Sequence, residues 1–407
     1  MKIIKLIVPL LLICICFSSC NIEGSLSSIA DISEKSEGLS SLVLKDNEQQ
    51  NPNEEKLENY YNEQRTLDCG LIIDAPVRVK QVNQTLPKVN TKIIQPSPDT
   101  IFETFMYGKE IVYQEEYLAE NTYSDITTAQ VYRASDETVL SIQPTAIYYD
   151  TYLYTALYNT FRENKNDVTY NAEQFLTGEN LSFITIQEAE AKIKQVLNNF
   201  GIDMPNTTAV FTLNQVNIEG AQTEIDNYNK NAFSNEIEAE WFYSHIDWDS
   251  TLDCYIFLFS PEIENVFVTS YSQGFLEDGS LTQGSNIKVI YSQRGIEYLE
   301  ITNLYQVVDK ATPEKILALE QAISLLDQKY NSLILYGDYV VYDISLEYIP
   351  TRIKNDTKQF VMIPAWSFEI RHTSEYQKGS STVSLTERYR TVFNAINGEE
   401  IISEFKL

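Results

Sequence analysis

Residues 244–250 (SHIDWDS) hold side chains that could bind a metal ion. If this stretch is a strand, His245, Asp247 and Asp249 point the same way, because side chains alternate along a strand. One imidazole and two carboxylates would suit a divalent cation. Asp and Ser at these positions also favour a turn before the apolar stretch that contains Cys254, and this structural interpretation is the simpler one. A metal site at His245, Asp247 and Asp249 is therefore the alternative that a structure must test.

The motifs of common hydrolases are absent from the sequence. It contains only two histidines, His245 and His372, and neither H-E-x-x-H nor a G-x-S-x-G elbow occurs. Residues 285–288 (SNIK) fit S-x-x-K, but the S-D-N and K-T-G motifs that accompany it are missing. With 58 acidic residues, no pair suited to glycoside hydrolysis can be selected. The sequence predicts no catalytic residue and no cofactor, and a hydrolase with an unrecognised site is kept as an alternative.

The N-terminus predicts export. Lys2 and Lys5 precede an uncharged apolar run over residues 6–17, and two serines separate that run from Cys20. A positive start, a short apolar stretch and small residues are the layout of a secretory signal peptide. The run is too short to span a bilayer as a helix, which needs about 20 residues.

Residues 17–20 (FSSC) resemble a bacterial lipobox, whose cysteine is lipidated and becomes the first residue of the mature protein. Most lipoboxes carry Leu where Phe17 stands. The resemblance implies a signal peptide over residues 1–19, a diacylated or triacylated (palmitate-type) Cys20, and attachment to the outer face of the cytoplasmic membrane of a Gram-positive-type envelope. An ordinary cleaved signal peptide is the alternative.

Two further cysteines, Cys69 and Cys254, follow the export signal. In an oxidising compartment they could form a disulfide. A disulfide requires a specific approach of the two residues, which the sequence does not establish. The Cys69–Cys254 bridge is therefore a possibility and its alternative is two free thiols.

The composition excludes one class of partner. The chain has 30 Lys and Arg against 58 Asp and Glu, a formal net charge of −28. Nucleic-acid binding needs a basic surface that displaces counterions, so we expect no nucleic-acid partner. Apolar residues make up 43% of the 407 residues, which is enough for a sizeable core and for two or three domains. The 27 tyrosines are typical of half-buried strands and can also form binding surfaces.

The order of segments predicts the domains. Residues 20–65 are polar and rich in Ser, Asn and Glu, so we expect a flexible tether after the anchor. Residues 66–177 show strand-like stretches separated by turn residues and predict a mainly β region. Two similar units follow, over residues 178–308 and 309–407, each expected to consist of a helix and antiparallel strands.

Capping signals and apolar spacing predict the two helices. Thr185 and Glu188 fit a capping box and Gly201 suits a C-terminal cap, while Thr312 and Pro313 begin the second helix. Residues 339–349 (YVVYDISLEYI) alternate as in a strand, and Asn397-Gly398 is a strong turn signal. The predicted fold class is α+β: two similar helix-plus-antiparallel-sheet units after a mainly β N-terminal region. The apolar helical stripes consist of Ala189, Ile193, Val196, Leu197 and Phe200 in the first helix and Ile316, Leu319, Ile323 and Leu326 in the second.

Residues 360–370 (FVMIPAWSFEI) and 391–402 (TVFNAINGEEII) resemble the closing strands of PepSY-like modules, where a Pro-x-Trp strand precedes an Asn-Ala-x-x-Gly-Glu turn. Together with residues 179–202 and the lipobox, the chain resembles uncharacterised surface lipoproteins of Clostridia and related Gram-positive bacteria. The resemblance covers residues 179–407, and its PepSY-like part is the second unit, residues 309–407. It implies an extracytoplasmic, non-catalytic module that acts through protein contacts, with Trp366 and the turn at residues 395–398 defining the fold.

These observations together predict a lipid-anchored interaction or regulatory protein without an active site. It would contact the membrane through Cys20 and bind another envelope protein through sheet edges or exposed aromatic residues. The alternatives are a ligand- or glycan-binding lipoprotein and, less favoured, a hydrolase. Binding proteins of transporters usually alternate strands and helices around a hinge, whereas this sequence groups its strands after sparse helices.

Overall fold

The computed structural model describes most of the chain beyond the N-terminal segment. The described residues are 60–79, 84–119, 128–157, 160–163, 170–202, 206–232, 248–271, 284–333, 335, 337–353, 356–378 and 381–406. The chain divides into a small unit, Met1–Leu42 with Gln377–Val383, and a large unit, Val43–Tyr376 with Ser384–Leu407. All elements below belong to the large unit, apart from the adjoining ends of two long strands.

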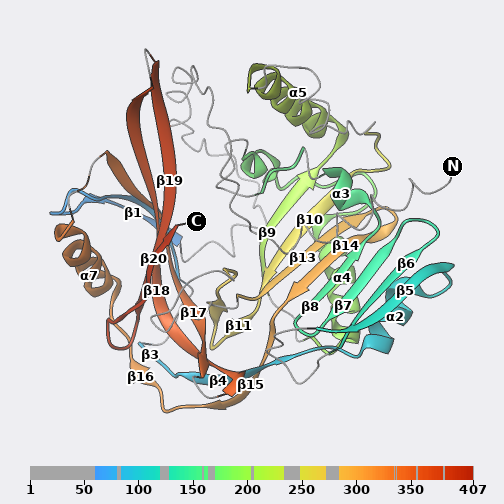
Figure 1. Cartoon of the computed structure of the whole chain (residues 1–407), viewed down its shortest axis with the longest axis horizontal. Coiled ribbons are helices and arrows are strands. Elements are labelled where there is room, and N and C mark those ends of the chain that lie inside the picture. The colour runs from blue at the N-terminus through green and yellow to red at the C-terminus, as the bar shows by residue number, and fades with distance from the viewer. Residues whose placement is uncertain are drawn as a thin grey trace. The chain divides into compact units, whose positions relative to one another are not determined.

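One sheet of the described chain has eight antiparallel strands. Their order across the sheet is β5-β6-β7-β8-β14-β13-β10-β9, so β5 and β9 form its edges (Figure 1). The strands are β5 (Ile111–Leu118), β6 (Thr128–Ala134), β7 (Val139–Gln143), β8 (Ala146–Asp150), β14 (Gly295–Thr302), β13 (Asn286–Ser292), β10 (Cys254–Ser260) and β9 (Asn206–Leu213).

Helices cover both faces of this eight-stranded sheet. On one face, α2 (Pro98–Met106) and α4 (Ile186–Asn199) pack into a cluster that contains Tyr255, Phe257 and Leu299. On the other, α3 (Leu153–Leu157), the 3-10 helix η3 (Ala172–Phe175) and α5 (Gln215–Ala232) pack with Cys254 and Ile256. Neighbouring residues of β10 thus enter different clusters, as the alternation of strand side chains requires.

The second sheet has ten strands and joins both ends of the described chain (Figure 1). Its main path is β1-β2-β17-β18-β19-β20, and β2 runs parallel to β17. β4 pairs with β18 and β15, and β12 pairs with β17 and β11. The strands are β1 (Tyr60–Thr66), β2 (Ile72–Arg78), β4 (Val89–Ile94), β11 (Glu262–Ile263), β12 (Val266–Val268), β15 (Leu304–Lys310), β17 (Asp338–Ile353), β18 (Asp356–Lys378), β19 (Ser381–Asn394) and β20 (Glu400–Lys406).

Helix α7 (Leu319–Asn331) packs on one face of this ten-stranded sheet. Its buried residues Ala322, Ile323 and Leu326 join a cluster that contains Val341 and Phe368. β3 (Thr85–Leu86) and β16 (Glu314–Lys315) form a separate two-stranded antiparallel sheet. In the sequence, β3 precedes β4 and β16 follows β15. Trp366 also packs in this cluster and donates a 3.0 Å hydrogen bond from its indole N–H to the Leu317 carbonyl.

The α+β expectation is wrong: the fold is mostly β with large sheets. The strands of residues 66–177 are divided between the sheets. β2 and β4 pair with C-terminal strands, whereas β5–β8 form a run in the other sheet and β8 joins that run to β14. A helix followed by strands is a local pattern, and it does not reveal which distant strands complete a sheet. β1 also begins at Tyr60, within the segment that we expected to be a tether.

Candidate functional site

Strand β5 is the most exposed edge of the eight-stranded sheet. Among the described strands it pairs only with β6, and its residues from Val112 onward are all exposed. Leu118 is 75% exposed and Tyr107, which follows α2, is 86% exposed. The exposed large apolar side chains of this segment are Tyr107, Val112, Tyr113, Tyr117 and Leu118. We call residues 107–118 the β5 edge.

The α2–β5 connection fixes where this edge begins. Ser97 caps α2, whose residues Ile101, Phe105 and Met106 are buried. Gly108 then takes a left-handed conformation (φ +77°), which a glycine adopts without steric cost and which redirects the chain into β5. Lys109 is the next residue and anchors the turn.

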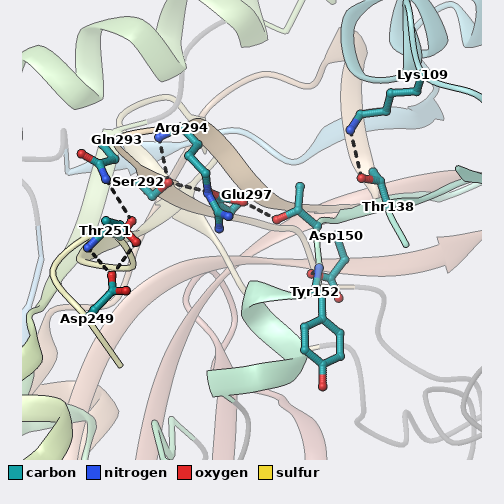
Figure 2. Close-up of polar contacts among 11 residues, drawn as sticks. Lys109, Thr138, Asp150, Tyr152, Asp249, Thr251, Ser292, Gln293, Arg294 and Glu297 are labelled. Carbon is teal, nitrogen blue, oxygen red and sulfur yellow. Dashed lines mark hydrogen bonds and ion pairs between the residues drawn. The ribbon is translucent and has the colours of Figure 1, made fainter. Parts of the chain in front are cut away.

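Lys109 ties the start of β5 to the β6–β7 turn. Its ammonium donates to the Asp136 carboxylate. It also donates to Thr138 Oγ1 over 3.0 Å, as Figure 2 shows. The hydrogen bond from Lys109, with a second contribution from Thr138, lowers the pKa of Asp136 to about 2. The ion pair is therefore formed throughout the neutral range, and it holds the first residues of β5 in place.

Alternation divides the remaining side chains of β5 between two faces. Tyr113, Glu115 and Tyr117 share one face, and the Tyr113 hydroxyl donates to the Glu115 carboxylate. Glu116 lies opposite Gln130 of β6, whose amide donates to it over 3.1 Å. The register shifts between Ile111 and Tyr113, so Val112 occupies a bulge. The edge thus has apolar residues near both ends and one carboxylate on each face at its centre.

Lys288 of β13 occupies a buried ionic site on the opposite side of the sheet from α4. Its ammonium donates to Glu163 and lies 3.7 Å from Glu300 Oε2 and 3.4 Å from the Tyr154 hydroxyl. Burial alone would lower the pKa of Lys288, but the surrounding acidic groups outweigh it and raise this pKa. Lys288 therefore stays protonated at neutral pH, which is unsuitable for a nucleophile or a general base.

A second buried ionic network crosses the ten-stranded sheet. Arg390 of β19 donates to Glu347 of β17, to Ser367 Oγ over 2.8 Å and to Thr269 Oγ1 over 3.0 Å. Nearby, Arg78 of β2 donates to Asp343 of β17. These contacts join strands from opposite ends of the chain, so we assign the network a structural role.

A third network of hydrogen bonds connects the β13–β14 hairpin to the residue that follows β8 (Figure 2). The buried Glu297 carboxylate accepts hydrogen bonds from the hydroxyls of Ser292 and Thr151 and from Arg294 Nε, the last over 2.6 Å. The Thr151 backbone N–H also donates to the Glu297 carbonyl over 2.9 Å. The three donors to its carboxylate make Glu297 a structural anchor of the hairpin.

Of the predicted metal ligands, only Asp249 belongs to the described residues. Its exposed carboxylate accepts hydrogen bonds from the hydroxyl and backbone N–H of Thr251, and both lower the pKa of Asp249 (Figure 2). This is a local turn motif, as the simpler interpretation of the sequence expects. His245 and Asp247 lie outside the described residues, as does Cys20. Within the described ranges, no group of three or more His, Cys, Asp and Glu side chains is arranged to hold a metal.

The structure does not bring Cys69 and Cys254 together. Both thiols are free. Cys69 packs against the α7 cluster of the ten-stranded sheet, whereas Cys254 is buried in the α5 cluster of the eight-stranded sheet. His372, the other histidine, stacks on Tyr339 with 4.0 Å between ring centres, and its Nδ1 lies 3.6 Å from Glu387 Oε2.

The sequence contained weak signals for the features that its motifs missed. Residues 111–118 (IVYQEEYL) carry apolar residues at both ends and two central glutamates, and residues 286–292 (NIKVIYS) place Lys288 inside an apolar strand. Neither pattern reveals an edge or a buried ion pair without the distant partner strands.

No helix in the described part of the chain combines the length and the apolar character needed to cross a membrane.

Comparison with known proteins gives a fold relationship. No protein-family model matches the chain, and no curated protein matches it. Among solved structures, it is similar to an uncharacterized protein from Eubacterium rectale ATCC 33656, with a TM-score of 0.64 and 16% sequence identity. The match covers 84% of this chain and 93% of the other. At this identity the similarity concerns the fold alone.

Proposed function

We propose that this protein is a lipid-anchored, extracytoplasmic interaction protein without an active site, which binds another envelope protein through the β5 edge. The anchor is proposed from the N-terminal pattern that ends at Cys20. The binding role depends on one observation: exposed apolar side chains are concentrated within residues 107–118, at a strand that is an edge of its sheet among the described strands. Open edges and exposed aromatic residues are features that proteins use to bind other proteins.

Site-specific photocrosslinking in the producing cells tests the binding role. A photoreactive amino acid replaces Leu118 or Tyr107 in the anchored chain, and the control is Val216 on α5, which is 80% exposed. We expect Leu118 and Tyr107 to capture one and the same protein that Val216 does not capture. Equal capture from all three positions, or no capture from Leu118 and Tyr107, would contradict the proposal.

A separate experiment tests the anchor. Cells that express the natural chain and the Cys20→Ala variant are grown with labelled palmitate, and the labelled protein is detected after electrophoresis. We expect label on the natural chain and none on Cys20→Ala. Equal labelling of both would show that Cys20 is not the lipid acceptor.

A further inference from the structure

We propose that β5 receives an extended segment of its partner as an additional strand, and that this segment carries Lys or Arg opposite Glu115 and Glu116. The inference rests on the proposed function and specifies both the binding mode and the chemistry of the partner. It assigns the β5 edge a selectivity for cationic strands. Three properties of the edge support it: its open backbone, the place of its charges and its poor fit to a second copy.

Among the described strands only β6 pairs with β5, so within that part of the chain the other side of the β5 backbone has no strand partner. A strand that pairs on one side only presents a row of N–H and C=O groups on the other side, which an incoming strand can complete. β5 has eight residues, which at about 3.3 Å per residue gives an edge of roughly 26 Å. Because Lys109 anchors its start to Asp136 and Thr138, the edge is fixed before a partner arrives.

Glu115 and Glu116 determine which strand can bind. Adjacent residues of a strand lie on opposite faces, so each face of the edge carries one exposed carboxylate at its centre. A charge directly opposite across a strand pair stabilises the pair when its sign is opposite and destabilises it when its sign is the same. A partner segment with two central basic residues, flanked by apolar residues, therefore matches β5 on both faces.

The same carboxylates disfavour pairing with a second copy of this chain. Two copies related by a two-fold axis perpendicular to the sheet would pair antiparallel. The register that aligns Tyr113 with Tyr117 of the second copy places Glu115 opposite Glu115 of that copy. This like-charge contact, in a chain of formal net charge −28, opposes self-association. Central charges on open edges are a recognised protection against edge-to-edge pairing.

Binding of designed peptides to the purified chain tests the inference. One probe is a nine-residue peptide with two central lysines flanked by valine and tyrosine, and its comparator has two glutamates in place of the lysines. From two oppositely charged pairs against two like-charged pairs, we expect the lysine peptide to bind about tenfold more tightly. In Glu115→Lys/Glu116→Lys the preference should reverse. The control Glu219→Lys/Glu224→Lys changes the net charge equally at exposed positions of α5 and should keep the original preference.

Alternate N-methylation of the lysine peptide tests strand addition itself. Methyl groups on every second backbone nitrogen block one edge of the peptide and leave the other edge intact. We expect one of the two alternating patterns to retain binding and the other to abolish it. Equal binding of both patterns, no preference between lysine and glutamate peptides, or no binding of the lysine peptide would each overturn the inference.

Photocrosslinking from Leu118 separates this inference from the proposed function. If Glu115→Lys/Glu116→Lys captures the same protein with unchanged yield, the proposed function stands and the charge selectivity is wrong. If the natural chain captures nothing from Leu118 or Tyr107, the proposed function fails, whatever the peptides show. A yield that falls in the charge-reversed variant, but not in Glu219→Lys/Glu224→Lys, supports both.

Discussion

The guanidinium of Arg390, on β19 of the ten-stranded sheet, lies 4.2 Å from the centre of the Tyr271 ring. Arg390 is fully buried, so Tyr271 packs on a face of the sheet that carries charge. The geometry is that of a cation–π contact, which is stronger when the pair is removed from water. Tyr271 also donates a hydrogen bond to Glu369, so the ring is held from both its face and its hydroxyl.

Glu347 is the carboxylate on which Arg390 depends. We expect Glu347→Gln to lower the free energy of unfolding by about 3–5 kcal/mol, because it leaves a buried guanidinium without its charged partner. Urea denaturation measures the effect. The control is Glu314→Gln, whose exposed carboxylate lies 3.9 Å from Lys88 and should contribute at most about 1 kcal/mol. Similar small losses for both variants would contradict a structural role for the network.

Buried tyrosines make the fold sensitive to alkali. Burial raises the pKa of Tyr149 to about 12, while in the unfolded chain tyrosine titrates near pH 10. As the pH rises above about 10, the unfolded state therefore loses a proton that the folded state keeps, and the stability falls. We expect Tyr149→Phe to lose less stability than the natural chain between about pH 9 and pH 11, measured by urea denaturation at each pH. An identical loss of stability in both proteins would show that the pKa of Tyr149 is not raised by folding.

The Lys109–Asp136 pair predicts an acid effect at the β5 edge. The pKa of Asp136 is lowered to about 2, so its stabilisation is complete above the unfolded value near 3.9 and disappears as the pH falls through about 2. In Lys109→Met the main cause of the low pKa is removed. We expect the thermal midpoint of the natural chain to fall more steeply than that of Lys109→Met across this interval. Parallel curves would exclude a contribution from the pair.

The two thiols differ in access to reagents. Burial and the nearby Asp327 raise the pKa of Cys69, and burial raises the pKa of Cys254 further in a fully buried position. In a chain that lacks residues 1–19 and carries Cys20→Ala, we expect iodoacetamide to modify Cys69 slowly in the folded state. Cys254 should react only after unfolding. Intact mass measures both steps, and no modification after unfolding without reductant would reveal a disulfide.

Local signals predicted local structure well. The capping box of Thr185 and Glu188 is present at the start of α4, and Gly201 follows that helix with φ +72°. The predicted start of the second helix at Thr312 and Pro313 is wrong: residues 314–315 form β16, and α7 begins at Leu319 after Ala318. Pro313 suits the first turn of a helix, but pairing of β16 with β3 prevails in this segment.

Long-range structure could not be deduced in the same way. The alternation in residues 342–348 predicts a strand, and Ile344, Leu346 and Tyr348 do face the α7 cluster. Asp343 and Glu347 on the other face are buried as well, because Arg78 and Arg390 pair with them. Those partners come from β2 and β19, and no signal within β17 identifies them. The β5 edge is likewise defined by the order of strands in its sheet, which the sequence of residues 111–118 does not contain.

The parallel pairing of β2 with β17 cannot form until the chain has been synthesised through β17. Arg78 and Asp343, which join these strands, are 265 residues apart in the chain. A ribosome that adds about 5–20 residues per second needs roughly 15–50 s to make this stretch. During that interval β1 can pair with one side of β2, while the side that will pair with β17 has no partner. Wherever the chain emerges N-terminus first, at the ribosome or through the export pathway that we propose, β2 therefore precedes its partner β17 and presents an unpaired edge until β17 follows.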